Sequence, residues 1–178
     1  GLVLSPDVTT ASQEFGHRIV ARNDGRTIIV SAPGKGQGEV HFLFRKSADA
    51  GTSLSTQSTV TMTENDDNTS RLGESLSIST DENYVVAGAP FSNTVDSDGS
   101  TRQIDSGLVK VYQWNPSTFE YSILNTISPP TDGSSSNEGL NFGWQHKISE
   151  PGESSLRTTP RKYLFVSAPG HDSDRGRV

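Results

Sequence analysis

One short pattern occurs three times along the chain of 178 residues, and this repeat constrains the fold more than any other feature. Each copy has an apolar residue followed by Gly, a β-branched run, a turn, and a second run that ends in Ala-Pro. Recurrence of this kind is typical of proteins that stack identical structural units. The repeated positions are Phe15, Gly16, Ala32 and Pro33; Leu72, Gly73, Ala89 and Pro90; and Phe142, Gly143, Ala168 and Pro169.

The spacing of the glycines supports this alignment. Gly16 and Ala32 are as far apart as Gly73 and Ala89, while the third copy carries a longer insertion in its first hairpin. A second glycine follows each Ala-Pro pair and opens a third apolar run. These glycines, Gly38, Gly107 and Gly176, are evenly spaced along the chain.

The runs between the turns have the composition of β-strands. They are short, rich in β-branched and aromatic residues, and bounded by Gly, Pro, Asn, Asp and Ser, which favours strands over helices. Some alternate, with Val109 and Val111 on one face and Lys110 and Tyr112 on the other. The sequence therefore predicts an all-β chain, with strands at 27–30, 40–44, 58–63, 84–87, 109–114, 121–127 and 163–166.

Repeated units of four antiparallel strands predict a β-propeller. We expect blades at about 15–63, 72–127 and 142–178, with residues 1–14 forming the end of a preceding blade and a linker. Closed propellers have about four to eight blades. Three blades cannot close the ring, so the 178 residues are expected to be one fragment of a larger propeller of about seven blades. The remaining blades would come from the same longer chain. Blades from another chain, or an open three-blade solenoid, are the alternatives.

The order of FG, a strand, SAP or GAP, and then Gly-x-Val resembles the FG-GAP repeat. This repeat builds the propeller heads of integrin α-chains and of many bacterial and algal surface proteins, and the short-hairpin subtype matches best. The resemblance implies that the repeated residues specify blades and carry no chemistry. It also implies a possible calcium site in the first hairpin of a blade. Here those hairpins, ARNDGRT and STDENY, lack the necessary carboxylates.

The repeated residue types suit crowded junctions between blades. Phe15, Leu72 and Phe142 are expected to enter the innermost strand of each blade and pack between neighbours. The glycines after them allow backbones to approach closely, and the alanines are small for the same reason. Proline after alanine ends the second strand, because it cannot donate a ladder hydrogen bond.

The sequence offers only weak candidates for a metal site and no catalytic motif. Asp96, Asp98 and Asp105 have partial calcium character, but a solvated acidic turn is the favoured interpretation, so no cofactor is predicted. No G-x-S-x-G, H-E-x-x-H or Walker motif is present. The histidines fall at unrelated positions of the repeat, which disfavours a shared role: His17, His41, His146 and His171.

The charge and hydropathy of the chain argue against further classes of protein. A net charge of −6 disfavours nucleic-acid binding, which needs a basic face. No apolar stretch approaches the roughly 18 residues of a membrane-spanning helix. The sequence also contains no cysteine, so it has neither disulfides nor thiolate ligands.

The resemblance implies a non-enzymatic protein-interaction or adhesion module, secreted or at a cell or organelle surface, that binds protein partners through its rim loops. Asn68 begins an Asn-Thr-Ser glycosylation sequon, as in a secreted glycoprotein. One alternative is a structural scaffold subunit docked on a larger membrane assembly. Another is an accessory propeller of a hydrolase whose catalytic domain lies elsewhere.

Overall fold

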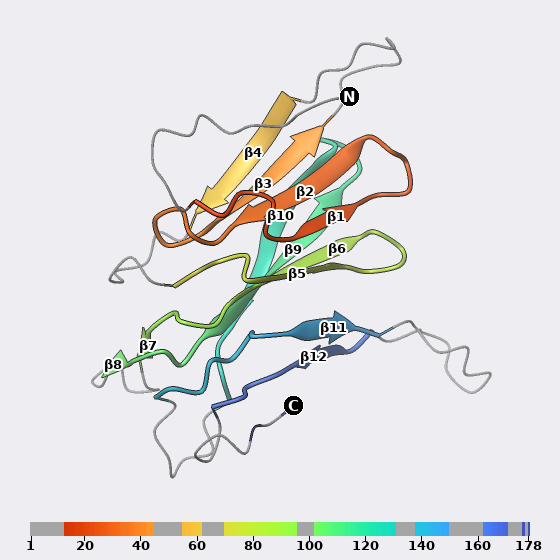
Figure 1. Ribbon diagram of the computed structural model, residues 1–178. Coiled ribbons are helices and arrows are strands. Elements are labelled where there is room, and N and C mark those ends of the chain that lie inside the picture. The colour runs from red at the N-terminus through yellow and green to blue at the C-terminus, as the bar shows by residue number, and fades with distance from the viewer. Residues whose placement is uncertain are drawn as a thin grey trace, which may run out of the picture.

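A computed structural model describes residues 13–44, 55–61, 70–95, 102–130, 138–149, 162–170, 176 and 178. Within these ranges the chain forms strands, turns and irregular segments, and it contains no helix (Figure 1). The prediction of an all-β chain is confirmed. It follows that this described part has no long apolar helix of the kind that crosses a membrane.

The first sheet is a four-stranded antiparallel meander. It contains β1 (Ile19–Ala21), β2 (Thr27–Ala32), β3 (Glu39–Phe44) and β4 (Ser55–Thr61), in the order of the sequence. The turn between β1 and β2 is closed by Asp24, whose Oδ1 accepts hydrogen bonds from the backbone N–H groups of Arg26 and Thr27. The Asn23-Asp24-Gly25 turn therefore acts as the hairpin signal that its sequence suggests.

The second sheet repeats this meander. Its strands are β5 (Ser75–Ile78), β6 (Tyr84–Ala89), β9 (Leu108–Asn115) and β10 (Glu120–Ile127), again antiparallel and in sequence order. A small hairpin of β7 (Thr94–Val95) and β8 (Arg102–Gln103) interrupts the connection from β6 to β9. A third, two-stranded sheet pairs β11 (His146–Ile148) with β12 (Leu164–Val166).

The predicted strands correspond to observed ones, with small shifts at their ends. The run 84–87 belongs to β6, which continues through Gly88 and Ala89 to the proline that stops it. The run 58–63 corresponds to β4, which begins earlier, at Ser55. The segments expected before residue 13 lie outside the described residues, as do the ends of several loops.

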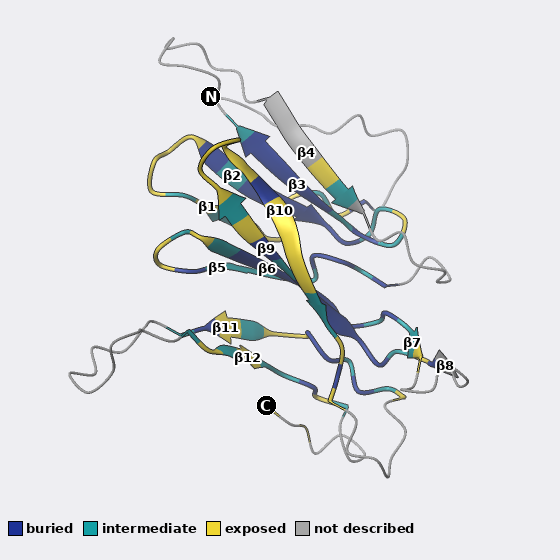
Figure 2. Cartoon of the chain, turned by 180° about the vertical axis from the view of Figure 1, so that it is seen from behind, coloured by how far each residue is buried: buried dark blue, intermediate teal, exposed yellow. Residues whose placement is uncertain are grey.

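The three sheets are stacked, and their first strands lie side by side. β1 contacts β5, and β5 contacts β11. Apolar residues of the first two sheets form one core, which includes Ile29, Phe42, Val85 and Tyr112. A second core lies between the second and third sheets and includes Val86, Val109, Phe142, Ile148 and Ala168. Most of β6 and the first half of β9 are therefore buried on both faces, whereas β10 is largely exposed (Figure 2).

The backbone takes the same unusual conformation at all three copies of the repeat. Gly16, Gly73 and Gly143 have φ of 90°, 92° and 92°, in the left-handed region that favours glycine. Their N–H groups donate to the carbonyl oxygen of the residue before each repeated alanine, at 2.9, 2.9 and 3.0 Å. Two residues earlier, φ is again positive at each copy: 54° at Glu14, 56° at Arg71 and 52° at Asn141.

The apolar residues of the repeat lie just before the first strand of each unit, whereas we expected them inside that strand. Phe15 and Leu72 are in turns, and Phe142 forms an isolated bridge with Gly107. Leu72 is fully buried, Phe142 is 9% exposed and Phe15 is half-buried. The glycines also differ from one another. A side chain on Gly73 or Gly143 would meet atoms of the adjacent unit, whereas one on Gly16 would meet no atom within 4 Å.

Candidate functional site

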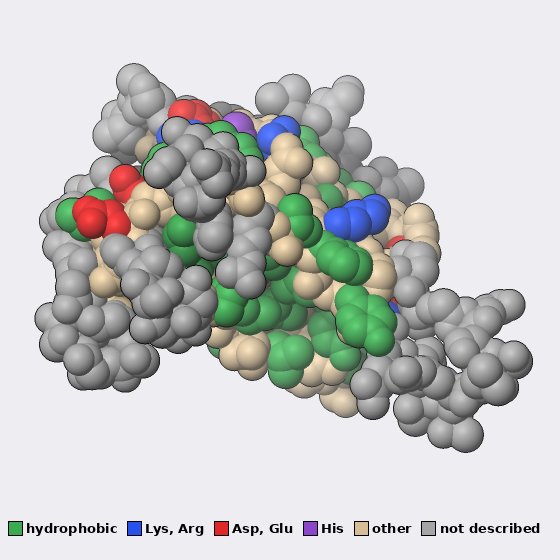
Figure 3. Space-filling view, turned by 90° about the horizontal axis from the view of Figure 1, so that it is seen from below, with side chains coloured by type: hydrophobic (Ala, Val, Ile, Leu, Met, Phe, Trp, Pro, Cys, Tyr) green, Lys and Arg blue, Asp and Glu red, His purple; other side chains and the backbone are tan. Residues whose placement is uncertain are grey.

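A groove of about 640 Å³ opens between the second sheet and the β11–β12 hairpin. Its floor is the face of β6, β9 and β10 that points towards the third sheet. Figure 3 shows hydrophobic side chains gathered on the side of the molecule where this hairpin lies. The apolar lining residues are Tyr84, Val86, Val111, Trp114, Pro116, Leu124, Ile127, Ile148, Tyr163 and Leu164.

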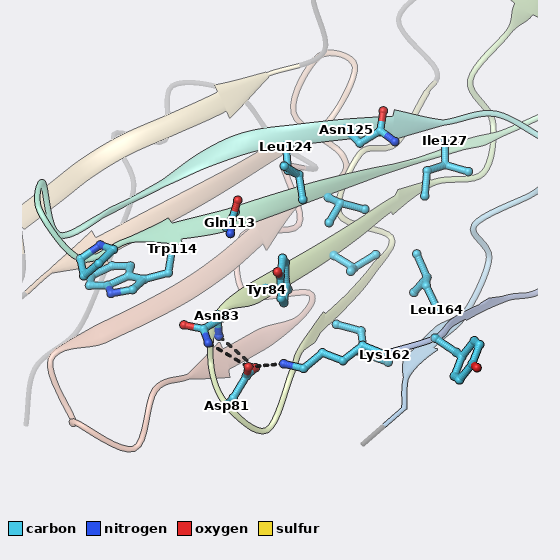
Figure 4. Close-up of a pocket in the computed structure, with 15 residues that line it drawn as sticks. Asp81, Asn83, Tyr84, Gln113, Trp114, Leu124, Asn125, Ile127, Lys162 and Leu164 are labelled. Carbon is cyan, nitrogen blue, oxygen red and sulfur yellow. Dashed lines mark hydrogen bonds and ion pairs between the residues drawn. The ribbon is translucent and has the colours of Figure 1, made fainter. Parts of the chain in front are cut away.

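An ion pair closes one end of the groove. The Lys162 ammonium contacts the Asp81 carboxylate and lies 5.1 Å from the centre of the Tyr84 ring (Figure 4). Desolvation would raise the pKa of Asp81, but hydrogen bonds from Lys162, Ser79 and Asn83 outweigh it and hold that pKa well below its usual range. Asp81 is therefore ionised at neutral pH and cannot serve as a general acid.

The sequence did not reveal this pair. A basic segment such as Arg157, Arg161 and Lys162 is typical of a solvated loop, and the two arginines lie outside the described residues. Instead, the Lys162 side chain is 22% exposed and bridges the hairpin of the second unit to the third unit. The sequence carries only a weak signal for this ion pair. Asp81 occupies the turn position in the second unit that Asp24 has in the first unit.

His146 lies at the contact between the second and third units. Its Nδ1 lies 2.8 Å from the Ser77 hydroxyl, across the contact between β11 and β5. Burial lowers the pKa of His146 to about 4. An imidazole with this pKa is a poor general base near neutral pH, so the serine–histidine contact has the character of a packing contact and not of a catalytic pair.

The other two described histidines have separate carboxylate partners. His17 Nε2 lies 3.3 Å from Glu74 Oε1, which links the first and second units. His41 Nε2 lies 3.0 Å from Glu39 Oε2, and burial lowers the pKa of His41 although Glu39 opposes this. His171 lies outside the described residues. The three histidines that are described therefore serve different local contacts.

The calcium candidates are only partly described. Asp105 ends the loop before β9, where its N–H donates to Asn93 Oδ1 at 2.9 Å and its carbonyl accepts from the Asn141 N–H at 2.9 Å. Asp96, Asp98 and the sequon residue Asn68 lie outside the described residues. Among the residues that can be placed, no three His, Cys, Asp or Glu side chains are grouped to hold a metal. The interpretation of the Asp96–Asp105 loop as a solvated acidic turn without calcium therefore stays a prediction.

A second surface lies at the end of the sheets that carries the β7–β8 hairpin. The connection into the third unit is attached there, because the Gly139 N–H donates to the Ile104 carbonyl at 2.8 Å. Val95 and Ile104 are 63% and 50% exposed. Tryptophan usually fills space between packed elements, but Trp144 is 41% exposed and touches Phe91 edge-on, with 5.7 Å between ring centres. This rim surface (Val95, Ile104 and Trp144) thus presents apolar groups on hydrogen-bonded loops.

The chain was compared with protein-family models and with curated proteins by sequence. No protein-family model matches it, and neither does any curated protein. Function is therefore inferred from the sequence repeat and from the geometry described above.

Proposed function

We propose that the chain is three consecutive units of an FG-GAP-type β-propeller and serves as a non-enzymatic protein-interaction module. The observation that carries this proposal is the repeated junction between units. The Leu72 N–H donates to the Gln37 carbonyl at 2.9 Å, and the Phe142 N–H donates to the Ser106 carbonyl at 3.0 Å, at equivalent positions of the repeat. A constant junction implies a constant rotation from unit to unit, which generates an arc and, with more units, a ring.

The rim surface is the part of this arrangement best suited to a protein partner. Propellers present variable loops on a rigid framework, and binding usually occurs there. Apolar and aromatic groups exposed on these loops favour contact with another protein. We also propose that the protein lies outside the cytosol and carries a glycan on Asn68. Binding of the partner does not require calcium in this proposal.

The test is partner capture by the immobilised chain from the surface and secreted proteins of its source cells, followed by cross-linking to identify the contact. We expect a Val95→Asp/Ile104→Asp double variant to lose the captured protein. Ile123→Asp is the matched control, because Ile123 is 53% exposed on the outer strand β10, away from these loops. Equal capture by the double variant and the control would refute a role for the rim surface.

A further inference from the structure

We infer that Thr59 is a site of covalent acylation, at which His41 removes the hydroxyl proton and Glu39 holds the imidazole in place. The acyl donor would be an aryl ester or a thioester, whose leaving group departs as a stable anion. The product is one modified threonine on each chain, so the site adds a chemical step to an interaction module without enzymatic turnover. The inference does not depend on the proposed rim surface.

Three side chains of the first sheet form a continuous line of contacts. The Thr59 Oγ1 lies 3.2 Å from His41 Nδ1, and His41 Nε2 lies 3.0 Å from Glu39 Oε2. A carboxylate can only accept a hydrogen bond, so Nε2 carries the ring proton and Nδ1 accepts from the Thr59 hydroxyl. A hydroxyl within reach of a base that a third group orients is the arrangement of an activated nucleophile.

The strand pairing brings this hydroxyl to the ring. The backbone N–H and carbonyl of Ser31 bond to the segment that enters β1, so the backbone groups of Val30 face β3 and its partner His41. The groups of His41 therefore face β2, and the pair of His41 with Thr59 has no backbone hydrogen bonds of its own. Side chains are closest in such pairs. The Thr59 N–H points away from β3, in position to donate to the oxygen of an attacked carbonyl.

The hydroxyl is accessible while its base is enclosed. Thr59 is exposed, whereas His41 is only 7% exposed. Burial lowers the pKa of His41 although Glu39 opposes this, so the ring is uncharged at neutral pH and Nδ1 keeps its lone pair. The Lys35 ammonium, 3.0 Å from the same Glu39 oxygen, also opposes a charge on the ring. The Phe15 ring meets the imidazole edge-on, with 5.2 Å between ring centres, and limits its rotation.

The acylation step needs no group beyond the donor and these side chains. Thr59 Oγ1 forms a bond to the acyl carbon, and its proton moves to His41 Nδ1. The bond from the acyl carbon to the leaving oxygen or sulfur breaks, and the leaving group takes the electron pair. The imidazolium, paired with Glu39, then returns the proton to solvent. Hydrolysis of the new ester would require water at the same nitrogen. Because His41 lies buried behind the acylated oxygen, we expect the ester to persist.

The second unit has the same register without this chemistry. In the repeat, Lys110 takes the place of His41, and a leucine takes the place of the carboxylate. The residue opposite Lys110 is Thr126, the counterpart of Thr59. An ammonium has no lone pair to accept the hydroxyl proton, so Thr126 stays an ordinary alcohol. Packing of a unit therefore does not require the histidine and the carboxylate, and the chain supplies its own control.

The experiment treats the folded 178-residue chain with p-nitrophenyl acetate at neutral pH and maps the acetylated residues by mass spectrometry. Neutral hydroxylamine removes esters and leaves acetylated lysines, so it separates the two products. Thr59→Val and Thr59→Ser change only the exposed acceptor, and His41→Gln removes the base. Thr126 is the internal control in every sample. The NMR signals of the β6 and β9 amides check that each variant is folded.

We expect acetylation of Thr59 that hydroxylamine reverses, none at Thr126, and retention of the label in Thr59→Ser. His41→Gln should slow the labelling by about 100-fold, as expected for loss of a general base. Glu39→Gln should also slow it. Nitrogen NMR of the His41 ring should then show the proton on either nitrogen instead of on Nε2 alone, a change that a purely structural carboxylate would not cause.

Three results would overturn the inference: no acetyl group on Thr59, equal labelling of Thr59 and Thr126, or an unchanged rate in a folded His41→Gln variant. If His41→Gln does not fold, the comparison of the two threonines in the native chain decides alone. Partner capture by the rim surface is measured separately, so failure at Thr59 leaves that proposal standing.

Discussion

Gly38 lies directly against the backbone of Leu72, so that a methyl group on Gly38 would be 2.1 Å from the Leu72 nitrogen. Gly107 has the same relationship to Phe142, where the methyl group would be 2.2 Å from the carbonyl oxygen. These two contacts join the first unit to the second and the second to the third. Neither can relax by rotation of a side chain, because the obstructing atoms belong to the backbone.

Gly38→Ala should therefore destabilise the protein much more than Gly16→Ala. Both glycines have strongly positive φ, 98° and 90°, so both substitutions carry a backbone strain of about 1–2 kcal/mol. Only Gly38 has a close neighbour, and overpacking adds about 1–3 kcal/mol. The free energy of unfolding in urea measures the difference. Equal losses for the two variants would show that the unit junction is not tight.

Tyr112 and Tyr121 both pack against the Phe42 ring. Loss of the hydroxyl group should change the stability of the protein in opposite directions at these two positions. The Tyr112 hydroxyl is buried without a hydrogen-bond partner among the described residues, and desolvation raises the pKa of Tyr112 far above its usual value. The Tyr121 hydroxyl donates to the Glu82 carbonyl at 2.6 Å. Tyr112→Phe should leave stability unchanged or raise it by up to about 1 kcal/mol, and Tyr121→Phe should lower it by about 1 kcal/mol. Thermal unfolding of the two variants checks this, and a reversed order contradicts the assignment.

The sequence predicted the strands well because their signal is local. β-branched runs bounded by Gly and Ala-Pro specify β2 and β6 with little help from the rest of the chain, and Asn23-Asp24-Gly25 specifies a tight hairpin. The repeat also pointed to positions that share one backbone conformation, since only glycine takes φ near 90° at low cost.

Contacts between units could not be predicted in the same way, because they depend on how two sheets meet. Nothing near Lys162 in the sequence shows that its ammonium reaches Asp81 in the preceding unit. The exposure of Trp144 could not be predicted either, because aromatic residues usually fill cores, whereas this ring meets the Phe91 ring edge-on at the surface. The groove lies at the same junction, so it also depends on how the second and third sheets meet.

The Asp81–Lys162 pair should hold the third unit against the second. Lys162→Gln removes the positive charge but keeps much of the side-chain length, and we expect amide exchange in β11 and β12 to accelerate several-fold. Exchange in β2 and β3, in the distant first sheet, should not change. Lys147→Gln is the control, because this lysine is exposed in β11, whereas the lysine that pairs with Asp81 is Lys162. Equal exchange in the two variants would show that the pair contributes nothing.

Stability should fall in mild acid because His146 is buried as the neutral imidazole. Burial lowers the pKa of His146 in the folded protein to about 4, while an unfolded chain has a histidine pKa of about 6.5. Below pH 6.5 the unfolded state therefore binds more protons than the folded state. This contribution to stability is complete above about pH 6.5 and is lost as the pH falls to about 4, to a total of about 3 kcal/mol.

The double variant Ser77→Ala/His146→Leu isolates this effect. Leu76 holds the position of His146 in the second unit, so leucine suits this place in the repeat, and Ser77→Ala avoids an unpaired hydroxyl. His41, whose pKa burial also lowers, stays in both proteins and contributes equally. Urea unfolding at a series of pH values from 7.5 to 4 should show a smaller loss of stability in the double variant, by about 3 kcal/mol at the acid end. Parallel curves for the two proteins would show that His146 takes up its proton without opening the contact between β5 and β11.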